Sequence, residues 1–200
     1  GLDVAAYNCK FIPGMALAFG VSPIGAHHKE SWVITFELKQ TSRESYGPEK
    51  AKKVIELQRI RGGLFEYMVS CRFPWIELGW GLENYPKYFK LATGLDWTLD
   101  DFWTVSDRIY ALMKLFWLRE YPQTERKLDY PPAVWFDPTN ADTEGPIAGK
   151  VLEYDKYDGL LQHYYDNRGY DKRGIPKMAT LEKLGLAAEA KAAEKFGTLT

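Results

Sequence analysis

The feature that most constrains the fold is a long helical pattern that begins at Thr98. Thr98 is followed by Asp100 and Asp101, residue types that favour a helix start because they accept hydrogen bonds from its first turn and bring negative charge to it. Apolar residues then recur at alternating spacings of three and four: Phe102, Val105, Ile109, Leu112 and Phe116. A second apolar stripe is formed by Trp103, Tyr110, Met113 and Trp117. A helix that is apolar on two sides is expected to be buried between layers.

Shorter helical patterns flank this segment. We expect helices within residues 12–22, 48–71, 82–94, 151–169 and 180–186, and a frayed terminal helix within 187–196. Pro13 and Pro48 suit the first turns of two of these helices, because a missing N–H costs little there. Gly94 and Gly169 suit helix ends, and Thr180 suits a helix cap. The Pro-rich, polar residues 121–150 predict a long connection.

Two segments give weaker signals. Residues 31–38 predict a strand or an extended segment. Gly62 and Gly63 interrupt the pattern over 48–71 at a cost of roughly 1 kcal/mol each, which indicates a break or the close approach of another element. Pro74 is expected to end that helix and to push Phe73 out of the helical region. The chain as a whole predicts a mostly α, irregular multi-helix domain with little or no sheet.

Composition narrows the class of protein. The chain has 200 residues, 46% of them hydrophobic, and a formal net charge of −1, which fits one globular domain and gives no reason to expect a nucleic acid partner. No apolar run approaches the roughly 18 residues of a membrane span, so no membrane is expected. Two cysteines make no disulfide framework, which favours a cytoplasmic protein. Because the chain starts at Gly1, we expect a processed or excised piece of a longer protein.

Cys71, in the stretch FEYMVSCRFPW, lies where the pattern over 48–71 ends. The partial negative charge at a helix C-terminus disfavours a thiolate, so Cys71 is a poor candidate nucleophile. A metal could deprotonate the thiol, but a four-iron cluster typically needs four thiolates, and the chain has only Cys9 and Cys71. Local sequence therefore leaves two readings: an inert core thiol, or one ligand of a site that this chain does not complete.

The pair His27 and His28, in GAHHKE, is the other candidate for chemistry. Adjacent side chains point in different directions, so one site is expected to use only one of them. That histidine is either a proton donor or acceptor or a surface residue, while Lys29 and Glu30 are expected to be solvated. The sequence has no GxGxxG, GxxxxGK[ST], GxSxG, HExxH or CxxC motif.

Four segments, taken in order, resemble one family. GMALAFGVSPIGAHH is similar to the segment GMALAYATS-x-x-G-x-x-H of the tungsten-containing aldehyde:ferredoxin oxidoreductase family, and EYMVSCRF to its D-x-x-G-L-C-x-F element. ATGLDWTLDDFWTVSDRIYALMKLFWLRE resembles its TG-x-DWTPEE…GERI-x-NLERLFN-x-RE run, and HYYDNRGYDKRGIPKMATLEKLGL its YY-x-x-RGWD-x-x-GIPT-x-EKLEELGL terminus. The resemblance covers residues 6–186 and the C-terminal, largely helical part of the family.

The resemblance implies roles for three residues. Cys71 falls on the fourth cysteine ligand of a [4Fe–4S] cluster, and Glu66 on an aspartate that contacts a pterin. Val69 and Ser70 replace the glycine and leucine of that element. His28 falls on the histidine that faces the substrate as a proton donor or acceptor. Cys9 has no counterpart in the pattern and is expected to be structural.

The implied function is that of the whole enzyme. The resemblance predicts the C-terminal portion, residues 1–200, of an oxidoreductase that holds tungsten or molybdenum between two pterins and oxidises aldehydes to carboxylic acids. Ferredoxin or another electron carrier, a small aldehyde or acyl substrate and the N-terminal pterin-binding part of the same enzyme are the expected partners, with a homo-oligomer possible. Two alternatives stay open: a subunit like the tungsten subunit of benzoyl-CoA reductases, and a non-catalytic helical interaction domain derived from the family.

Overall fold

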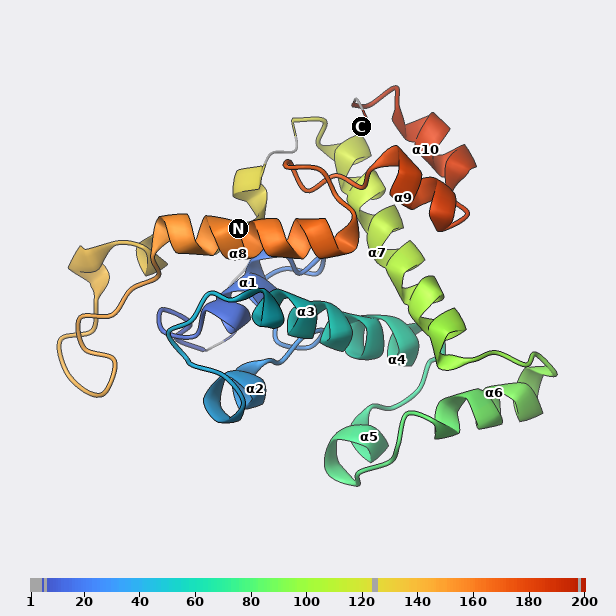
Figure 1. Cartoon of the computed structure of the whole chain (residues 1–200), viewed down its shortest axis with the longest axis horizontal. Coiled ribbons are helices and arrows are strands. Elements are labelled where there is room, and N and C mark those ends of the chain that lie inside the picture. The colour runs from blue at the N-terminus through green and yellow to red at the C-terminus, as the bar shows by residue number, and fades with distance from the viewer. Residues whose placement is uncertain (1–4, 6, 124–125, 198) are drawn as a thin grey trace.

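Helices, and no β-strand, form the regular structure of the residues that the computed structural model describes, namely 5, 7–123, 126–197 and 199–200. The α-helices are α1 (Pro13–Gly20), α2 (Ile34–Lys39), α3 (Pro48–Leu57), α4 (Phe65–Tyr67), α5 (Phe73–Glu77), α6 (Asn84–Thr93), α7 (Leu99–Glu120), α8 (Tyr154–Arg168), α9 (Met178–Lys183) and α10 (Ala187–Ala193) (Figure 1). A π-helical segment, Gln58–Leu64, joins α3 to α4. The prediction of a mostly α fold is confirmed.

Helix α7 starts at the predicted cap. The side chain of Thr98 accepts a hydrogen bond from the backbone N–H of Asp101 at 3.3 Å, and the Asp101 carboxylate accepts one from the N–H of Thr98 at 2.7 Å. This reciprocal capping box satisfies two N–H groups that a helix start leaves without partners. These hydrogen bonds also hold the pKa of the Asp101 carboxyl below its usual value.

Helix α7 is buried along only part of its two predicted apolar stripes. Its buried residues are Phe102, Ser106, Tyr110, Ala111, Leu115 and Leu118. Phe102 and Tyr110 belong to the predicted stripes, whereas Phe116 and Trp117 of the same stripes are 49% and 48% exposed. The small residues Ser106 and Ala111 are buried because other segments approach α7 closely there. Apolar spacing alone could not identify these positions.

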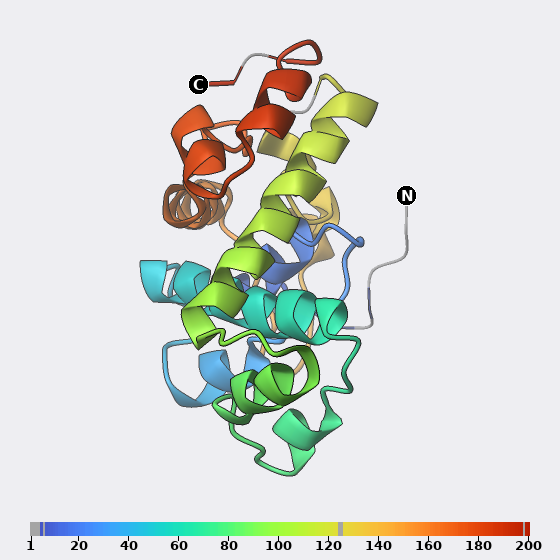
Figure 2. The same ribbon diagram turned by 90° about the vertical axis from the view of Figure 1, so that its right-hand side faces the viewer.

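The glycine pair lies where α7 crosses the π-helical segment (Figure 2). A Cβ atom added to Gly62 would lie 2.1 Å from the hydroxyl oxygen of Tyr110, and one added to Gly63 would lie 2.1 Å from the Oγ atom of Ser106. Real Cβ atoms do not approach oxygen that closely, so glycine is needed at both positions for this crossing. The predicted close approach of another element is confirmed, and the helix changes to π geometry at the same place.

Residues 31–38 do not form a strand, because they lead into and form most of helix α2. The pattern of apolar residues is misleading in this segment. The charged Glu37 is the buried residue of α2, whereas the apolar Leu38 is 53% exposed. The Glu37 carboxylate accepts hydrogen bonds from the backbone N–H groups of Gly14 and Met15, both at 2.8 Å, at the start of α1. It also receives the ammonium group of Lys50 at 2.8 Å, and both side chains are completely buried.

Pro74 does not end the preceding helix. Helix α4 already ends at Tyr67, and Val69 turns the chain with a positive φ of 51°. Pro74 then lies in the first turn of α5, where its missing N–H is tolerated, and Phe73 is helical. Pro74 is therefore the second residue of a new helix rather than the end of the preceding one.

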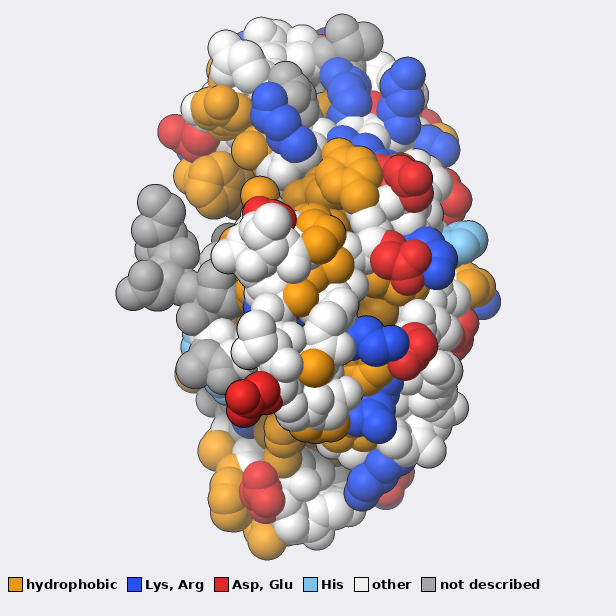
Figure 3. Space-filling model, turned by 90° about the vertical axis from the view of Figure 1, so that its left-hand side faces the viewer, with side chains coloured by type: hydrophobic (Ala, Val, Ile, Leu, Met, Phe, Trp, Pro, Cys, Tyr) orange, Lys and Arg blue, Asp and Glu red, His pale blue; other side chains and the backbone are white. Residues whose placement is uncertain are grey.

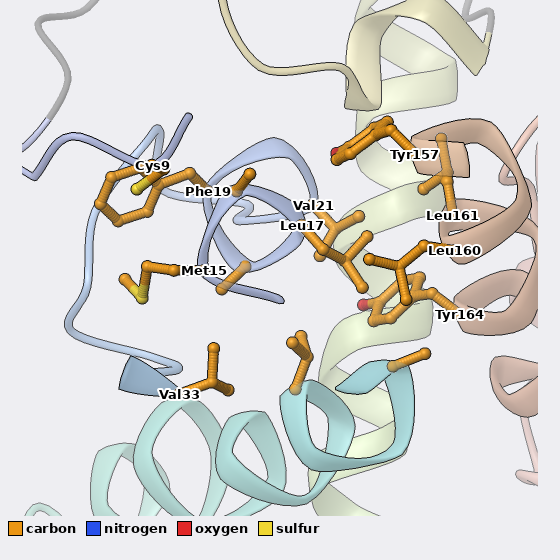
Figure 4. Packing of buried hydrophobic residues seen from close by; sticks show 14 of the residues in the cluster. Cys9, Met15, Leu17, Phe19, Val21, Val33, Tyr157, Leu160, Leu161 and Tyr164 are labelled. Carbon is orange, nitrogen blue, oxygen red and sulfur yellow. The ribbon is translucent and has the colours of Figure 1, made fainter. Parts of the chain in front are cut away.

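The main core forms where α1 packs against α3 and α8. In Figure 4, Leu17 and Val21 of the α1 segment face Tyr157, Leu160, Leu161 and Tyr164 of α8. Cys9 lies in the same core beside Phe19 and is completely buried, and burial raises the pKa of its thiol far above the usual value. Cys9 is therefore a structural residue, as expected.

The C-terminal helices complete the molecule. Helices α9 and α10 pack against each other, and α10 packs against α7. Gly169 ends α8 with a φ of 69°, as predicted. Thr180 does not cap α9, because Lys177 holds the N-cap position, but its hydroxyl donates a hydrogen bond to the carbonyl oxygen of Gly169 at 2.7 Å. That bond fixes α9 to the end of α8.

Residues 121–150 form the expected connection, and where they are described they contain only short 3-10 helices: Arg126–Asp129, Ala133–Trp135 and Pro138–Asn140. Acidic and basic side chains are interspersed on the face shown in Figure 3, in keeping with the small net charge. Among the described residues, no helix is both long enough and apolar enough to cross a membrane.

Candidate functional site

The predicted residues His28, Glu66 and Cys71 lie on two segments that one arginine joins. His28 is in the loop between α1 and α2, Glu66 is in α4, and Cys71 is in the link between α4 and α5. Arg72 donates one hydrogen bond to the backbone carbonyl of Lys29 at 3.0 Å and another to the Glu66 carboxylate at 2.6 Å. The loop of His28 and the segment of Glu66 and Cys71 are therefore held together.

Lys29 adds a second link between the same two segments. Its ammonium group lies 3.1 Å from the Glu66 carboxylate, so that carboxylate accepts both Lys29 and Arg72. The Glu66 side chain is 42% exposed, and so each pair by itself contributes little to stability. The significance of the pairs is geometric, since they fix where the Glu66 side chain points.

The π-helical segment holds the other side of the His28 loop. Arg61 donates a hydrogen bond to the carbonyl oxygen of Lys29 at 2.8 Å and a long one to that of His28 at 3.5 Å. Two guanidinium groups, those of Arg61 and Arg72, therefore meet at one carbonyl group. Burial, followed by the neighbouring charge of Arg72, lowers the pKa of Arg61 to about 10. π-Helical turns are frequent at functional sites, where they re-aim side chains.

His28, rather than His27, has the free ring nitrogen. The Nδ1 atom of His27 accepts a hydrogen bond from the backbone N–H of Lys29 at 2.9 Å. The Nδ1 atom of His28 is buried and has no hydrogen-bond partner within the described part of the chain. The His28 ring stacks on that of His27, with centroids 4.6 Å apart, and meets the edge of Tyr7 at 5.2 Å.

The electrostatic surroundings of His28 favour its neutral form. Desolvation lowers the pKa of His28, and the nearby charges of His27 and Arg61 lower it further. A neutral imidazole with an unpartnered nitrogen can accept a proton from a reacting group. The surroundings therefore keep His28 in the neutral form that a proton acceptor needs.

Cys71 is exposed rather than buried, so the reading of an inert core thiol does not fit. Its Sγ atom accepts a hydrogen bond from the backbone N–H of Phe73 at 3.4 Å. The thiol lines a hollow of about 370 Å³ together with Met68, Ser70, Pro74, Trp80, Tyr85 and Tyr88. Hydrogen bonds to sulfur are one means by which proteins tune thiolate ligands of iron–sulfur clusters. An accessible, hydrogen-bonded thiol fits one ligand contributed from this chain.

The described residues do not complete a metal site. No three His, Cys, Asp or Glu side chains within the described ranges could hold one ion together. The Glu66 carboxylate already binds Lys29 and Arg72, so a pterin would have to share this carboxylate with the two side chains.

Val69 is one departure from the family pattern that this segment resembles. It stands where that pattern has glycine, and its φ of 51° lies in the left-handed region. A β-branched residue is strained there, whereas glycine adopts the conformation freely. Its side chain is 92% exposed, so no packing within the described residues offsets the strain. The turn that presents Cys71 is thus kept although its usual glycine is replaced.

Glu30 is the residue that sequence reasoning assigned wrongly. It is 5% exposed instead of solvated, because it packs over the flat backbone at Gly62 beside Tyr110. The Ser22 hydroxyl donates a long hydrogen bond to it at 3.5 Å, and the Tyr110 hydroxyl lies beside the carboxyl group without completing a hydrogen bond. Desolvation raises the pKa of Glu30 to about 7, although Tyr110, Lys29 and Ser22 act to lower it.

The sequence contained no motif that marked Glu30, Arg61 or Arg72 as part of the site. Each is a charged residue inside or beside an apolar run, at positions 30, 61 and 72. Charged residues in such runs are rarely buried unless they are paired, which is the one available clue. Which groups pair with them depends on the tertiary fold.

Comparison with protein families gives one extended match. The family model described as "Aldehyde ferredoxin oxidoreductase, domains 2 & 3" matches residues 1–186. The tungsten-containing aldehyde ferredoxin oxidoreductase of Pyrococcus furiosus is 26% identical over 191 residues, covering 93% of this chain and 30% of that protein. The aliphatic sulfonate oxidoreductase, WOR-like subunit, of the same organism is 29% identical over 205 residues, covering 96% and 30%. The chain thus spans about a third of the length of these relatives.

A solved structure shares the fold. The active site complex BamBC of benzoyl coenzyme A reductase, in complex with 1,5-dienoyl-CoA, aligns with a TM-score of 0.53 and 19% sequence identity. The alignment covers 72% of this chain and 21% of that one. At this identity, the likeness concerns the fold alone.

Proposed function

Because the chain belongs to the aldehyde ferredoxin oxidoreductase family, through domains 2 and 3 of that family, we propose that it is the helical portion of a tungsten–pterin, iron–sulfur oxidoreductase. The reaction that we propose for the whole enzyme is the oxidation of an aldehyde to a carboxylic acid, with ferredoxin or another carrier as electron acceptor. Support comes from the relatives named as tungsten-containing aldehyde ferredoxin oxidoreductases. We propose tungsten rather than molybdenum as the metal because the names of these relatives specify tungsten.

Arg72 carries the structural part of the proposal. It follows Cys71 in the chain and donates hydrogen bonds to the Glu66 carboxylate and to the carbonyl oxygen of Lys29, the residue after His28. Its side chain therefore links the two segments that carry the three proposed site residues. The carbonyl oxygen of Lys29 accepts hydrogen bonds from two guanidinium groups, those of Arg61 and Arg72. The convergence supports a site whose parts must keep fixed positions.

Each residue then has one task. His28, whose surroundings favour the neutral imidazole, accepts a proton from the reacting group. Glu66 contacts the pterin from a position set by Lys29 and Arg72. Cys71 contributes one thiolate to a [4Fe–4S] cluster. When bound, the tungsten–pterin group supplies the two-electron oxidation, and the cluster supplies a path for single electrons.

The remainder of the enzyme would cover the surface around Cys71. The α5–α6 region carries many exposed apolar residues: Val69, Phe73, Leu78, Trp80, Tyr88, Leu91 and Leu95. Since relatives are about three times as long as this chain, the natural occupant of this surface is the part of the enzyme that supplies the other cluster ligands. A homo-oligomer is a further possible occupant of exposed apolar surface.

Metal analysis of the anaerobically purified, full-length protein tests the proposal. We expect tungsten and iron in the protein, and a loss of iron in Cys71→Ala with unchanged helix content by circular dichroism. Cys9→Ala is the matched control, because Cys9 is buried in the core and should leave the iron content unchanged. Absence of both metals from the unaltered protein would leave the non-catalytic helical domain as the better reading.

Ring reduction of an aromatic acyl-CoA is the second candidate, favoured only by the fold shared with the benzoyl coenzyme A reductase complex. Steady-state assays separate the two functions. Aldehyde-dependent reduction of an electron acceptor supports the first, and consumption of an aryl-CoA with a reduced donor supports the second.

A further inference from the structure

Ser70 carries a hydroxyl group that the described part of the chain does not use. Its Oγ atom is buried and has no hydrogen-bond partner among the residues that the structure describes. The backbone of the same residue is held in place, because its N–H group donates to the carbonyl oxygen of Phe65 at 3.0 Å. Buried hydroxyl groups nearly always have a partner, since leaving one unpaired destabilises the folded state. The orphaned hydroxyl group of Ser70 therefore points to a partner outside the described residues.

The family pattern makes this hydroxyl group more informative. In the D-x-x-G-L-C element the position before the cysteine holds leucine, whereas this chain has Ser70 before Cys71. Replacing an apolar side chain by a buried hydroxyl group gains no hydrogen bond within the part of the chain that the structure describes. Contacts among these residues therefore do not explain the serine, and its immediate neighbour is the proposed cluster ligand.

Ser70 and Cys71 line the same hollow of about 370 Å³. They belong to the link between α4 and α5, which in Figure 1 runs away from the core of α1, α3 and α8. Met68, Pro74 and Trp80 give the hollow apolar walls. A hydrogen bond in apolar surroundings is stronger than in water, because the effective dielectric constant is lower. A hydroxyl group at this place can therefore act strongly on an acceptor bound beside it.

Neither the Cys71 thiol nor the nearby ion pair satisfies the Ser70 hydroxyl group. The Sγ atom of Cys71 accepts a hydrogen bond from the backbone N–H of Phe73 at 3.4 Å and none from Ser70. The Glu66 carboxylate binds Arg72 at 2.6 Å and not Ser70. An iron–sulfur cluster ligated by Cys71 contains further sulfur atoms, and sulfur atoms of clusters accept hydrogen bonds.

We propose that the Ser70 hydroxyl group donates a hydrogen bond to a sulfur atom of the cluster that Cys71 ligates, and that this bond raises the reduction potential of the cluster. The inference rests on the proposed function for the cluster itself. A reduced cluster carries one more negative charge than an oxidised one, so a hydrogen bond to its sulfur stabilises the reduced form more. A cluster of higher potential passes its electrons to a carrier of correspondingly higher potential. Leucine at this position cannot have that effect.

A redox titration of the anaerobically purified, full-length protein, followed by electron paramagnetic resonance, tests this role. Ser70→Ala removes the hydroxyl group and should lower the midpoint potential of the cluster by about 59 mV, which corresponds to a tenfold change in a one-electron equilibrium constant. Ser70→Leu introduces the residue of the family pattern and should shift the potential in the same direction. It decides the test if Ser70→Ala does not retain iron. A potential that is unchanged or raised overturns the proposal.

Two control variants show whether the hydroxyl group itself is responsible. Ser70→Thr keeps a hydroxyl group and should keep the potential of the unaltered protein. Ser42→Ala removes an exposed serine hydroxyl group in the link between α2 and α3, outside the hollow, and should change nothing. If Ser42→Ala lowers the potential as much as Ser70→Ala does, the shift is not specific and the proposal fails.

Electron–nuclear double resonance of the reduced cluster separates a hydrogen bond from a change in solvent access. In the unaltered protein we expect a coupled proton that exchanges in D₂O and that is absent from Ser70→Ala. The coupling of the Phe73 N–H proton should remain in both proteins, because its donor is a backbone group. The same set of exchangeable couplings in both proteins contradicts the hydrogen bond.

Iron content separates a failure of this inference from a failure of the proposed function. An unaltered protein without iron removes the cluster at Cys71 and, with it, the role of Ser70. Iron at the level of the unaltered protein, with an unchanged potential in the variants, removes only the role of Ser70. Loss of iron from both Ser70→Ala and Ser70→Leu would show that the hydroxyl group is needed to assemble the cluster, which also contradicts a tuning role.

Discussion

Arg72, the residue after Cys71, donates a hydrogen bond to the Glu66 carboxylate at 2.6 Å. The same guanidinium group reaches the carbonyl oxygen of Lys29 at 3.0 Å. A displacement of the Cys71 segment therefore pulls on the loop of His28. The proposed metal ligand and the proposed proton acceptor are mechanically coupled through one side chain.

Replacing Arg72 by Gln should uncouple the two segments. We expect turnover to fall about tenfold because proton transfer is sensitive to small displacements, while stability falls by only about 1 kcal/mol. Steady-state kinetics and denaturation curves of the full-length enzyme measure these effects. Lys90→Gln, which removes an exposed ion pair with Asp96 of similar length, is the control and should change neither. Turnover equal to that of the unaltered enzyme would contradict the coupling.

Val69→Gly should stabilise the protein. Left-handed backbone costs a residue with a side chain roughly 1–2 kcal/mol, and the flexibility of glycine in the unfolded chain returns part of that gain. A net increase of about 0.5–1 kcal/mol in the free energy of unfolding is expected from urea denaturation. Val134→Gly serves as the comparison, since Val134 is also exposed but has no positive φ, and it should destabilise. If both variants destabilise, Val69 is not strained.

Glu30→Gln should alter the pH dependence of stability. The pKa of Glu30 is raised from 4.5 to about 7, so between these values the folded state binds more protons than the unfolded state. Its contribution to stability is therefore complete below pH 4.5 and is lost as the pH rises towards 7. At pH 8 the variant should be roughly 2–3 kcal/mol more stable than the unaltered protein.

Denaturation at pH 5 and pH 8 provides the measurement for Glu30. Glu56→Gln, an exposed carboxylate in α3, is the control and should leave the pH dependence unchanged. A Glu30 variant whose stability follows that of the unaltered protein at both pH values would show that Glu30 is charged throughout.

Gly62→Ala should disturb the crossing of α7 over the π-helical segment. The new methyl group would meet the Tyr110 hydroxyl at 2.1 Å, and relieving that overlap should cost about 2 kcal/mol. Adding Tyr110→Phe removes the hydroxyl and should restore about half of the loss in thermal denaturation. Gly159→Ala, in α8 with open space around it, should instead stabilise by about 0.5–1 kcal/mol. Failure of the double variant to recover would place the clash elsewhere.

Much of the fold follows from local signals. Thr98, Gly94 and Gly169 mark helix ends because the groups that decide those ends lie within a few residues. The errors arise where distant contacts decide. Residues 34–38 became helical around the buried charge of Glu37, and α7 buries the small residues Ser106 and Ala111 while Phe116 and Trp117 stay exposed.

The candidate site divides in the same way. His28, Glu66 and Cys71 came from resemblance to a family pattern, and the structure brings their segments together. Glu30 was misassigned, and Arg61 and Arg72 were not singled out, because groups distant in sequence decide their positions. The carbonyl oxygen of Lys29, which binds both arginines, is 32 and 43 residues away from them. A charged residue within an apolar run indicates that another group pairs with it. Which group this is depends on the tertiary fold.

The fully buried pair of Glu37 and Lys50 has a consequence for the order of folding. Neither charge can enter a dry interior before the other, since an unpaired buried charge is several kcal/mol less stable. Helices α1, α2 and α3 should therefore dock as one cooperative unit, with the N–H groups of Gly14 and Met15 protected from hydrogen exchange together.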